Sequence, residues 1–195
     1  MIEVTKLMHR KRSTWRQGGE SRRLARPCRR RTSTTAFPMA AEATAWLDKN
    51  KRPAAHSVVY VSFGSLVALD PDQMGEVAEG LYASGKPFLW VVRASETSKV
   101  PKGFAEKAEK RGLIVTWCPQ LDVLVGCFVT HCGWNSTVEG LGAGVPMVAM
   151  PQWADQPMNA KYVEDVWRLG VRVRPGPRGM VCRREVERCV KEVME

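Results

Sequence analysis

The sequence lacks the features that would mark a membrane protein or a metalloprotein. No stretch of the 195 residues approaches the roughly 18 consecutive apolar residues that a membrane-spanning helix needs, which excludes an integral membrane protein. The six cysteines form no CxxC pair and only three histidines accompany them, so we expect no zinc site. With no apolar secretory signal, we expect reduced cysteines in an intracellular compartment, most of them as small core residues.

Motifs typical of several enzyme classes are also absent. The sequence contains no Walker loop and no GxGxxG, HExxH or GxSxG motif. These absences argue against an ATPase, a dehydrogenase, a metalloprotease and a hydrolase. The 44% hydrophobic content nevertheless suffices for one globular domain with a sizeable core.

Acidic residues are scarce at the start of the chain. Residues 1–40 hold eleven basic and two acidic side chains, which give +9 of the chain's net charge of +10. We expect residues 1–40 to be a disordered basic leader and residues 41–195 to be the folded domain. We favour a solvated tail or a non-native extension for the leader, with an organelle transit peptide and a nucleic-acid arm as alternatives. We therefore expect a cytoplasmic protein, or a plastid protein if the leader is a transit peptide, with no membrane partner and no nucleic-acid binding by the domain.

A strand and a capped helix open the domain. Residues 58–62 form a short β-branched run that ends in a glycine turn, as a buried strand does. Asp70 then offers an N-cap, Pro71 the first helical position and Gln73 the reciprocal partner of a capping box. An apolar stripe at helical spacing follows, formed by Met74, Val77, Ala78 and Leu81.

Strand and helix signals alternate along the rest of the domain. We expect strands at 88–92, 113–115, 127–130 and 147–149, and helices at 104–110, 135–141, 155–167 and 183–194. Apolar strands separated by helices predict an α/β domain with a Rossmann-like, doubly wound parallel sheet. In such a sheet, ligands bind beyond the carboxyl ends of the strands.

The segment 130–137 carries an unusual set of polar groups between a strand and a helix. Asn135, Ser136 and the imidazole of His131 would surround free backbone N–H groups at a helix N-terminus, an arrangement suited to phosphate. Glu139 lies one turn further in and would accept two hydroxyl hydrogen bonds from a ribose diol. The alternative is that Asn135 and Ser136 only cap the helix and that His131 is an ordinary histidine at a strand end.

Two further features lie near this segment. The glycine turn at 62–65 also follows a strand and could face phosphate. Three of the seven tryptophans flank the proposed anion site: Trp117, Trp134 and Trp153. Trp117 could stack on a base while the Gln120 amide pairs with the base edge; a core tryptophan with a partnered N–H is the alternative.

The residues from Trp117 to Gln156 read WCPQLDVLVGCFVTHCGWNSTVEGLGAGVPMVAMPQWADQ. This stretch resembles the nucleotide-sugar signature, the PSPG box, of plant family-1 UDP-glycosyltransferases, and the resemblance extends from about Ala41 to Glu195. It implies the C-terminal, donor-binding half of a GT-B fold, in which two Rossmann-like domains face each other across a cleft. It also implies transfer of a hexosyl group, glucosyl by tendency, from a UDP-sugar to a hydroxyl of a small acceptor such as a flavonoid or hormone.

The resemblance also assigns roles to individual residues. The uridine would be bound by three residues. Trp117 would stack on uracil, Gln120 would lie close to the base and ribose, and Glu139 would bind the ribose hydroxyls. The diphosphate would be bound by Ser65, His131, Asn135 and Ser136. The sugar would be contacted by Trp134 and bound by Asp155 and Gln156. Gln at the last position of the box, here Gln156, goes with UDP-glucose in this family. The UDP-sugar is a co-substrate, and no metal or other cofactor is expected because a helix terminus and His131 take the role of a cation.

Two departures from the family pattern limit these expectations. The box is four residues shorter than its relatives, with the gap between Leu124 and Val125, so we expect a shortened helix after Gln120 and weaker UDP binding than with the four residues restored. No segment resembles the acceptor-binding domain with its catalytic histidine, so we assign no catalytic residue, His9 included, and expect a donor domain truncated at its C-terminus. Two hypotheses follow: the donor domain of a UDP-glucosyltransferase, or an inactive nucleotide-sugar-binding remnant or interaction module.

Overall fold

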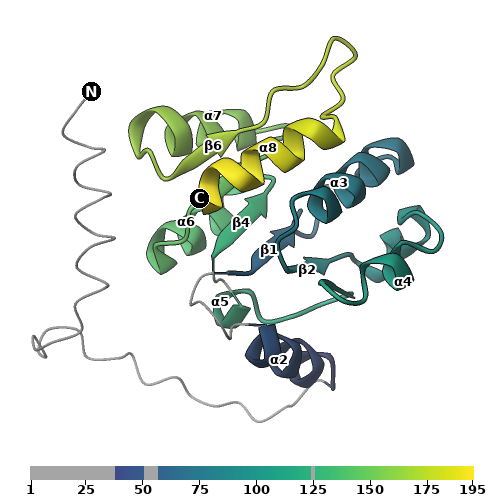
Figure 1. The fold of residues 1–195 in the computed structure, drawn as a ribbon. Coiled ribbons are helices and arrows are strands. Elements are labelled where there is room, and N and C mark those ends of the chain that lie inside the picture. The colour runs from purple at the N-terminus through teal and green to yellow at the C-terminus, as the bar shows by residue number, and fades with distance from the viewer. Residues whose placement is uncertain (1–37, 51–56, 124–125) are drawn as a thin grey trace, which may run out of the picture. The chain divides into compact units, whose positions relative to one another are not determined.

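A parallel sheet forms the centre of the domain in the computed structural model, which describes residues 38–50, 57–123 and 126–195 (Figure 1). Its strands are β1 (Val59–Ser62), β2 (Phe88–Val91), β3 (Gly112–Val115), β4 (Cys127–Thr130), β5 (Met147–Ala149) and β6 (Gly170–Arg172). Their order is β3-β2-β1-β4-β5-β6, and every neighbouring pair is parallel. The predicted doubly wound α/β sheet is confirmed. Residues 1–37 of the basic leader and the gap at Leu124–Val125 lie outside the described residues. The predicted boundary of the leader at residue 40 is wrong, because residues 38–40 belong to the helix Pro38–Asn50.

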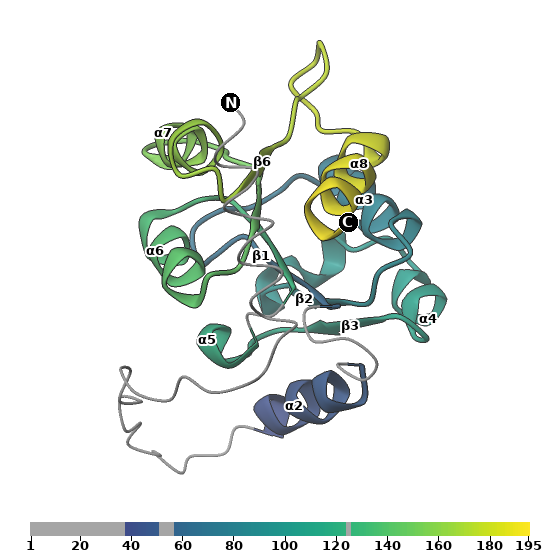
Figure 2. The same ribbon diagram turned by 60° about the vertical axis from the view of Figure 1, so that its left-hand side comes forward.

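Helices cover both faces of the sheet (Figure 2). They are α2 (Pro38–Asn50), α3 (Pro71–Ala83), α4 (Phe104–Ala108), α5 (Gln120–Val123), α6 (Trp134–Ala143), α7 (Gln156–Lys161) and α8 (Arg183–Met194). A 3-10 helix, η1 (Ala94–Lys99), and a π-helical turn, η2 (Tyr162–Val166), complete the described elements. Within the described ranges, no helix is both long and apolar enough to cross a membrane.

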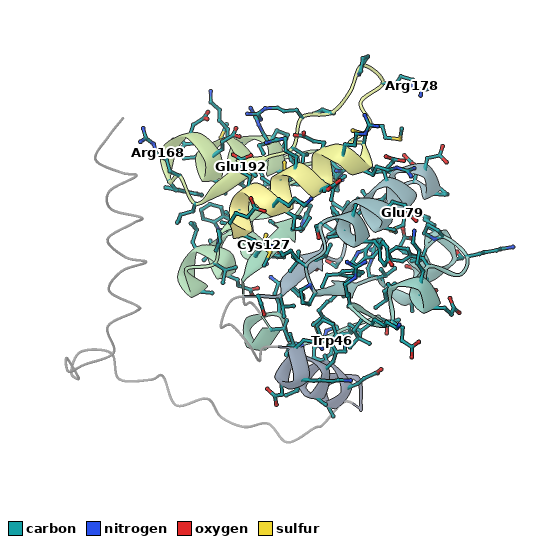
Figure 3. All side chains as sticks on the ribbon, in the orientation of Figure 1. Trp46, Glu79, Cys127, Arg168, Arg178 and Glu192 are labelled. Carbon is teal, nitrogen blue, oxygen red and sulfur yellow. The ribbon has the colours of Figure 1, made fainter. Side chains whose placement is uncertain are left out.

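Alternate residues of the strands β1 to β5 enter two separate cores. Val59 and Val61 of β1 pack with α3, α4 and α8, whereas Val58 and Tyr60 pack with α2, α6 and α7 on the other face. Trp46 of α2 packs against this second core (Figure 3). Burial on both faces explains why the strands read as continuous apolar runs, since each buried aliphatic side chain contributes about 1.5–3 kcal/mol.

The register of the sheet brings two predicted site segments together. Ser62, the last residue of β1, pairs with Thr130, the last residue of β4. From β1 the sheet continues through β2 to β3 on one side, and from β4 it continues through β5 to β6 on the other side. The segments after β1 and β4 therefore meet at the point where the strand order reverses, the usual ligand position in such sheets.

The start of α3 is only partly as predicted. The Asp70 carboxylate accepts a hydrogen bond from the Gln73 backbone N–H at 2.8 Å, as an N-cap does. The prediction that the Gln73 side chain bonds back to the N-cap residue is wrong. That amide instead donates to the Val181 carbonyl and accepts from the Val181 N–H, both at 2.8 Å, and so ties α3 to the segment before α8.

Other differences concern element boundaries. The helix expected at 155–167 is α7 followed by η2, where the Trp167 N–H donates to the Tyr162 carbonyl five residues back at 2.8 Å. The helix expected at 104–110 ends at Ala108. Neither α2 nor β6 was predicted; β6 is a three-residue edge strand, half-buried along its length, and lacks an apolar run.

Candidate functional site

His131 lies between two glycine backbones at the switch point of the sheet. It follows β4 and is 8% exposed. A Cβ atom added at Gly64 would lie 2.6 Å from the imidazole Cε1, and one added at Gly133 would lie 2.4 Å from Nε2. Only glycine leaves room for the ring at these two positions. The glycine turn after β1 and the start of α6, both expected to face phosphate, therefore meet around one imidazole.

The imidazole of His131 is neutral at pH 7. Burial lowers its pKa from the ordinary value, and the nearby Ser62 backbone and Asp155 carboxylate oppose this shift only in part. Its Nδ1 is buried and has no hydrogen-bond partner of normal geometry among the described residues. A neutral ring can donate one hydrogen bond but adds no charge, so the positive potential here comes from the helix that follows.

The N-terminus of α6 has no side-chain cap. Gly133 is the N-cap residue and offers no side chain, while Asn135 and Ser136 lie inside the first turn. The alternative that these two residues merely cap the helix is therefore wrong. Asn135 is exposed and the Ser136 side chain is buried. An uncapped first turn presents free N–H groups and about half a positive charge to an anion.

A hydrogen-bonded cluster joins three predicted residues from α5 and α6. The Gln120 amide donates to the Glu139 carboxylate and, at 3.4 Å, to Ser136 Oγ. The Tyr60 hydroxyl donates to Gln120 Oε1 at 3.3 Å from within β1. Tyr60 is 1% exposed and lies within the strand predicted at residues 58–62, where no site role was expected for it. The available signal was its hydroxyl, because a buried tyrosine O–H needs a partner.

Three tryptophans expose about half of their surface around this cluster. Trp117 is 49% exposed, Trp134 59% and Trp153 51%. The alternative of a core role for Trp117 is therefore wrong. Exposed indole surfaces offer flat faces on which a ring can stack.

Asp155 and Gln156 lie at the start of α7, where both also hold the local backbone. Gln156 is buried, and its Oε1 accepts from the N–H groups of Gln152 at 2.9 Å and Trp153 at 3.2 Å. The NH2 group is the part of this side chain that remains to donate to a ligand. The Asp155 carboxylate is exposed and accepts from the Asn159 amide at 2.7 Å.

Ser65 lies in the exposed segment after β1, next to the glycine that packs on His131. The Arg93 guanidinium holds this segment, because it donates to the carbonyls of Ser65 and, at 2.7 Å, of Val67. Sequence reasoning did not identify Arg93, which comes from the neighbouring strand end. The structure thus places Ser65 next in sequence to the glycine that packs on His131.

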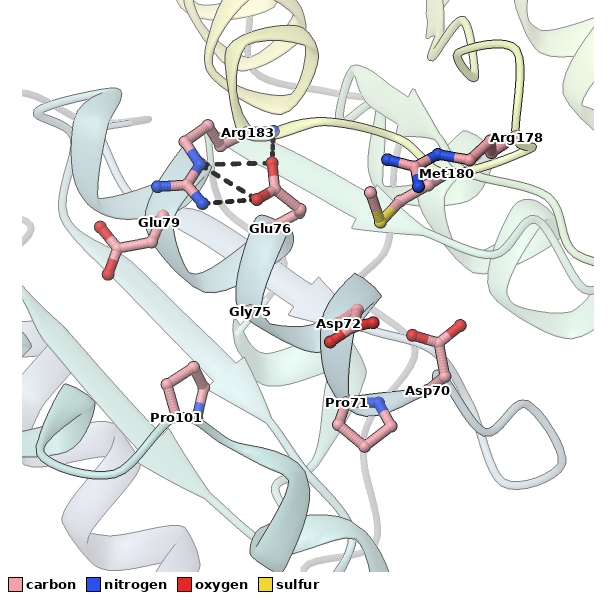
Figure 4. A pocket seen from close by; sticks show the side chains of 10 residues that line it. All are labelled: Asp70, Pro71, Asp72, Gly75, Glu76, Glu79, Pro101, Arg178, Met180 and Arg183. Atoms are coloured by element: carbon pink, nitrogen blue, oxygen red, sulfur yellow. Dashed lines mark hydrogen bonds and ion pairs between the residues drawn. The ribbon is translucent and has the colours of Figure 1, made fainter.

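A cavity of the described residues lies elsewhere, beside α3. It measures about 700 Å³ and contains none of the predicted site residues. Asp70, Asp72, Glu76 and Glu79 of the α3 region line it, together with Arg178 and Arg183 (Figure 4). Glu76 is paired with Arg183, and Glu79 with Lys107. Within the described ranges, no group of three or more His, Cys, Asp or Glu side chains is placed to hold a metal ion.

Comparisons with known proteins agree with this geometry. The sequence pattern of the family described as "UDP-glucoronosyl and UDP-glucosyl transferase" matches residues 33–195. The chain is 58% identical to crocetin glucosyltransferase 2 of Crocus sativus, over 77% of this chain and 33% of that protein. It is 57% identical to flavonol 7-O-beta-glucosyltransferase UGT74F1 of Arabidopsis thaliana, over 80% of this chain and 35% of that protein.

A solved structure with the same fold is Os79 from O. sativa in complex with UDP. The match has a TM-score of 0.76 and 52% identity, and it covers 78% of this chain and 34% of that one. The chain therefore spans about a third of the length of the relatives that it matches.

Proposed function

Because the chain belongs to the UDP-glucoronosyl and UDP-glucosyl transferase family, we propose that its domain binds the UDP-sugar donor of a small-molecule glycosyltransferase. One observation carries this proposal. At the reversal point of the sheet, the uncapped start of α6 and His131 lie beside the hydrogen-bonded cluster of Gln120, Ser136 and Glu139. This arrangement offers an anion site next to a carboxylate that can accept hydroxyl hydrogen bonds.

The uridine part of the donor would lie against Trp117. Its half-exposed indole offers a stacking face for uracil, and base–aromatic stacking contributes about 1–3 kcal/mol. Gln120 would contact the base and ribose from α5. Glu139 would accept hydrogen bonds from the ribose hydroxyls, and the Gln120 amide already holds this carboxylate in place.

The diphosphate would lie over the start of α6. Ser65, Asn135, Ser136 and His131 would donate hydrogen bonds to its oxygens. When the bond between the sugar and the diphosphate breaks, negative charge develops on the leaving group, and fixed donors stabilise it where it appears. The helix terminus supplies positive potential there, so we propose that no metal ion is needed.

The sugar would contact Trp134, Asp155 and Gln156. The Asp155 carboxylate would accept from sugar hydroxyls, and the NH2 group of Gln156 would donate to them. A sugar with one hydroxyl inverted would leave a buried group unpaired, at a cost of about 1–3 kcal/mol. We propose glucose as the sugar, because Gln156 stands at the position where this residue goes with UDP-glucose.

In the complete protein, the reaction would transfer the glucosyl group to a hydroxyl of a small molecule. The expected chemistry is direct displacement at the anomeric carbon, which inverts the configuration and yields a β-glucoside. Two relatives are named for crocetin and for a flavonol as acceptors. We propose an acceptor of this general kind, a small hydroxylated molecule.

Calorimetric titration of the 195-residue chain with UDP and UDP-glucose tests the donor site. We expect saturable binding of both ligands and weaker binding of ADP, which carries the same diphosphate on a different base. A Glu139→Ala variant should lose about 10- to 100-fold in UDP affinity, since a hydrogen bond to a charged group contributes about 1.5–3 kcal/mol. Equal binding of UDP and ADP would contradict uracil recognition, and the absence of any UDP binding would contradict the proposal.

A further inference from the structure

One buried amide connects the two loops that carry the proposed sugar and diphosphate ligands. Asn159, in the middle of α7, is 8% exposed. Its Nδ2 donates to the Asp155 carboxylate at 2.7 Å and to the Cys132 backbone carbonyl at 3.0 Å. Asp155 precedes α7, while Cys132 follows His131 in the segment after β4. The amide therefore joins the start of one helix to the loop that leads into another.

Both loops have an unusual backbone conformation. Cys132 has φ of 61° and Ala154 has φ of 57°, although neither residue is glycine. A non-glycine residue in this region costs of order 1–3 kcal/mol and persists only where its surroundings hold it. The hydrogen bond from Asn159 holds the Cys132 carbonyl directly. It also holds Asp155, the neighbour of Ala154.

An asparagine suits this position because both partners are acceptors. The NH2 group carries two hydrogens, one for a carbonyl oxygen and one for a carboxylate oxygen. An aspartate of the same shape would present two acceptors to two acceptors. An alanine would leave a buried carbonyl without its partner and would release the Asp155 side chain, which is otherwise exposed.

We propose that Asn159 is a positioning residue for the donor. It fixes the Asp155 carboxylate where the sugar hydroxyls would lie, and it fixes the Cys132 backbone, and with it His131, where the diphosphate would lie. This role rests on the proposed function, because it needs a UDP-sugar at the site. It acts through Asp155 and Cys132, without contact between Asn159 and the donor.

The test compares the affinities of UDP and UDP-glucose for variants of the 195-residue chain, measured by calorimetry after circular dichroism has established that each variant is folded. Asn159→Ala should weaken UDP binding a few-fold and UDP-glucose binding about tenfold more, because only UDP-glucose uses Asp155. Asn159→Asp should weaken both further, through repulsion between two carboxylates. Asn159→Ser, which keeps one donor, should lie between the unmodified chain and Asn159→Ala.

Two controls separate positioning from a general loss of structure. Gln152→Ala removes an exposed amide that donates to the Met150 and Pro151 carbonyls in the same region, and it should leave the ratio of the two affinities unchanged. In an Asp155→Ala background, Asn159→Ala should no longer weaken UDP-glucose binding more than UDP binding.

The outcomes distinguish this role from the proposed function. If the unmodified chain binds UDP but Asn159→Ala leaves the ratio of affinities unchanged, the positioning role is wrong and the donor site stands. The same conclusion follows if the extra loss persists without Asp155. If the unmodified chain binds neither ligand, the proposed function is wrong, and the role of Asn159 with it.

Discussion

The region around His131 and the cavity beside α3 differ in whether their polar groups already have partners within the protein. The cavity is large and lined by four carboxylates, yet Glu76 and Glu79 already pair with Arg183 and Lys107. The region around His131 holds a buried nitrogen with no hydrogen-bond partner among the described residues, an uncapped helix and half-exposed indoles. Polar groups without a hydrogen-bond partner mark the candidate ligand site in this domain, whereas the volume of the cavity beside α3 does not.

The electrostatics of the two regions follow from the same difference. Hydrogen bonds from Arg183 lower the pKa of the Glu76 carboxyl from its ordinary value, so this carboxylate stays ionised and neutralised in place. Burial lowers the pKa of His131, which favours the neutral ring, and its Nδ1 has no hydrogen-bond partner among the described residues. A charge that already has a partner contributes to stability, whereas a donor without one is available to a ligand.

The largest expected effect is on stability, at a contact of α3, the helix that borders the cavity. Gln73→Ala removes two buried hydrogen bonds and leaves the N–H and carbonyl of Val181 unpaired, so the free energy of unfolding should fall by about 2–4 kcal/mol. Urea denaturation measures this loss. UDP affinity should change less than twofold at a temperature where the variant is folded. A large loss of affinity would mean that the two regions are coupled.

A somewhat smaller effect is expected on binding, at the other region. His131→Ala should lower UDP affinity by about 10- to 100-fold, because it removes a donor to a charged oxygen. Uridine, which has no phosphate, should bind equally to both proteins. Glu79→Ala in the cavity is the matched control and should leave UDP affinity unchanged. Equal losses for UDP and uridine would place His131 outside the diphosphate site.

Most of the fold could be predicted because it depends on local patterns. Strands buried on both faces read as apolar runs, and an N-cap residue followed by proline, as at Asp70 and Pro71, marks the start of a helix. The return bond of Gln73 was predicted wrongly because its partner, Val181, is distant in the sequence. The π-helical turn of η2 was missed because its residues also fit an α-helical pattern.

The site residues within the Trp117–Gln156 stretch could be found because they lie close together in the sequence. Their supporting residues could not. Tyr60 contacts Gln120 from a strand that is 60 residues earlier, and Asn159 reaches a carbonyl that is 27 residues earlier. Arg93 holds carbonyls of Ser65 and Val67 that carry no side-chain signal. Such contacts depend on the order of strands in the sheet, which alternation of helices and strands alone does not specify.

The pH dependence of stability should also report on His131, with a smaller effect. Its pKa is lower in the folded domain than in the unfolded chain, so the unfolded chain takes up the proton first as the pH falls. The contribution of His131 to stability is therefore full above its unfolded pKa of about 6.5 and declines below it, until the folded pKa is reached. Urea denaturation between pH 7.5 and 5 should show a shallower decline for His131→Gln. Parallel curves would mean that this ring is not buried as a neutral group.

The smallest effect is expected for Glu76→Gln, which breaks the main ion pair of the cavity but keeps the shape of the side chain. The folded pKa of Glu76 is lowered, so its contribution to stability is present above its ordinary pKa and is lost as the pH falls through the folded value. Because the Arg183 side chain is exposed, the pair contributes little. The variant should unfold at a slightly lower urea concentration than the unmodified chain at pH 7, and the difference should become smaller as the pH falls below the ordinary pKa of the carboxyl. UDP affinity should not change, since none of the predicted donor-site residues lines the cavity. A clear loss of affinity would make the cavity part of the donor site and remove the contrast between the two regions.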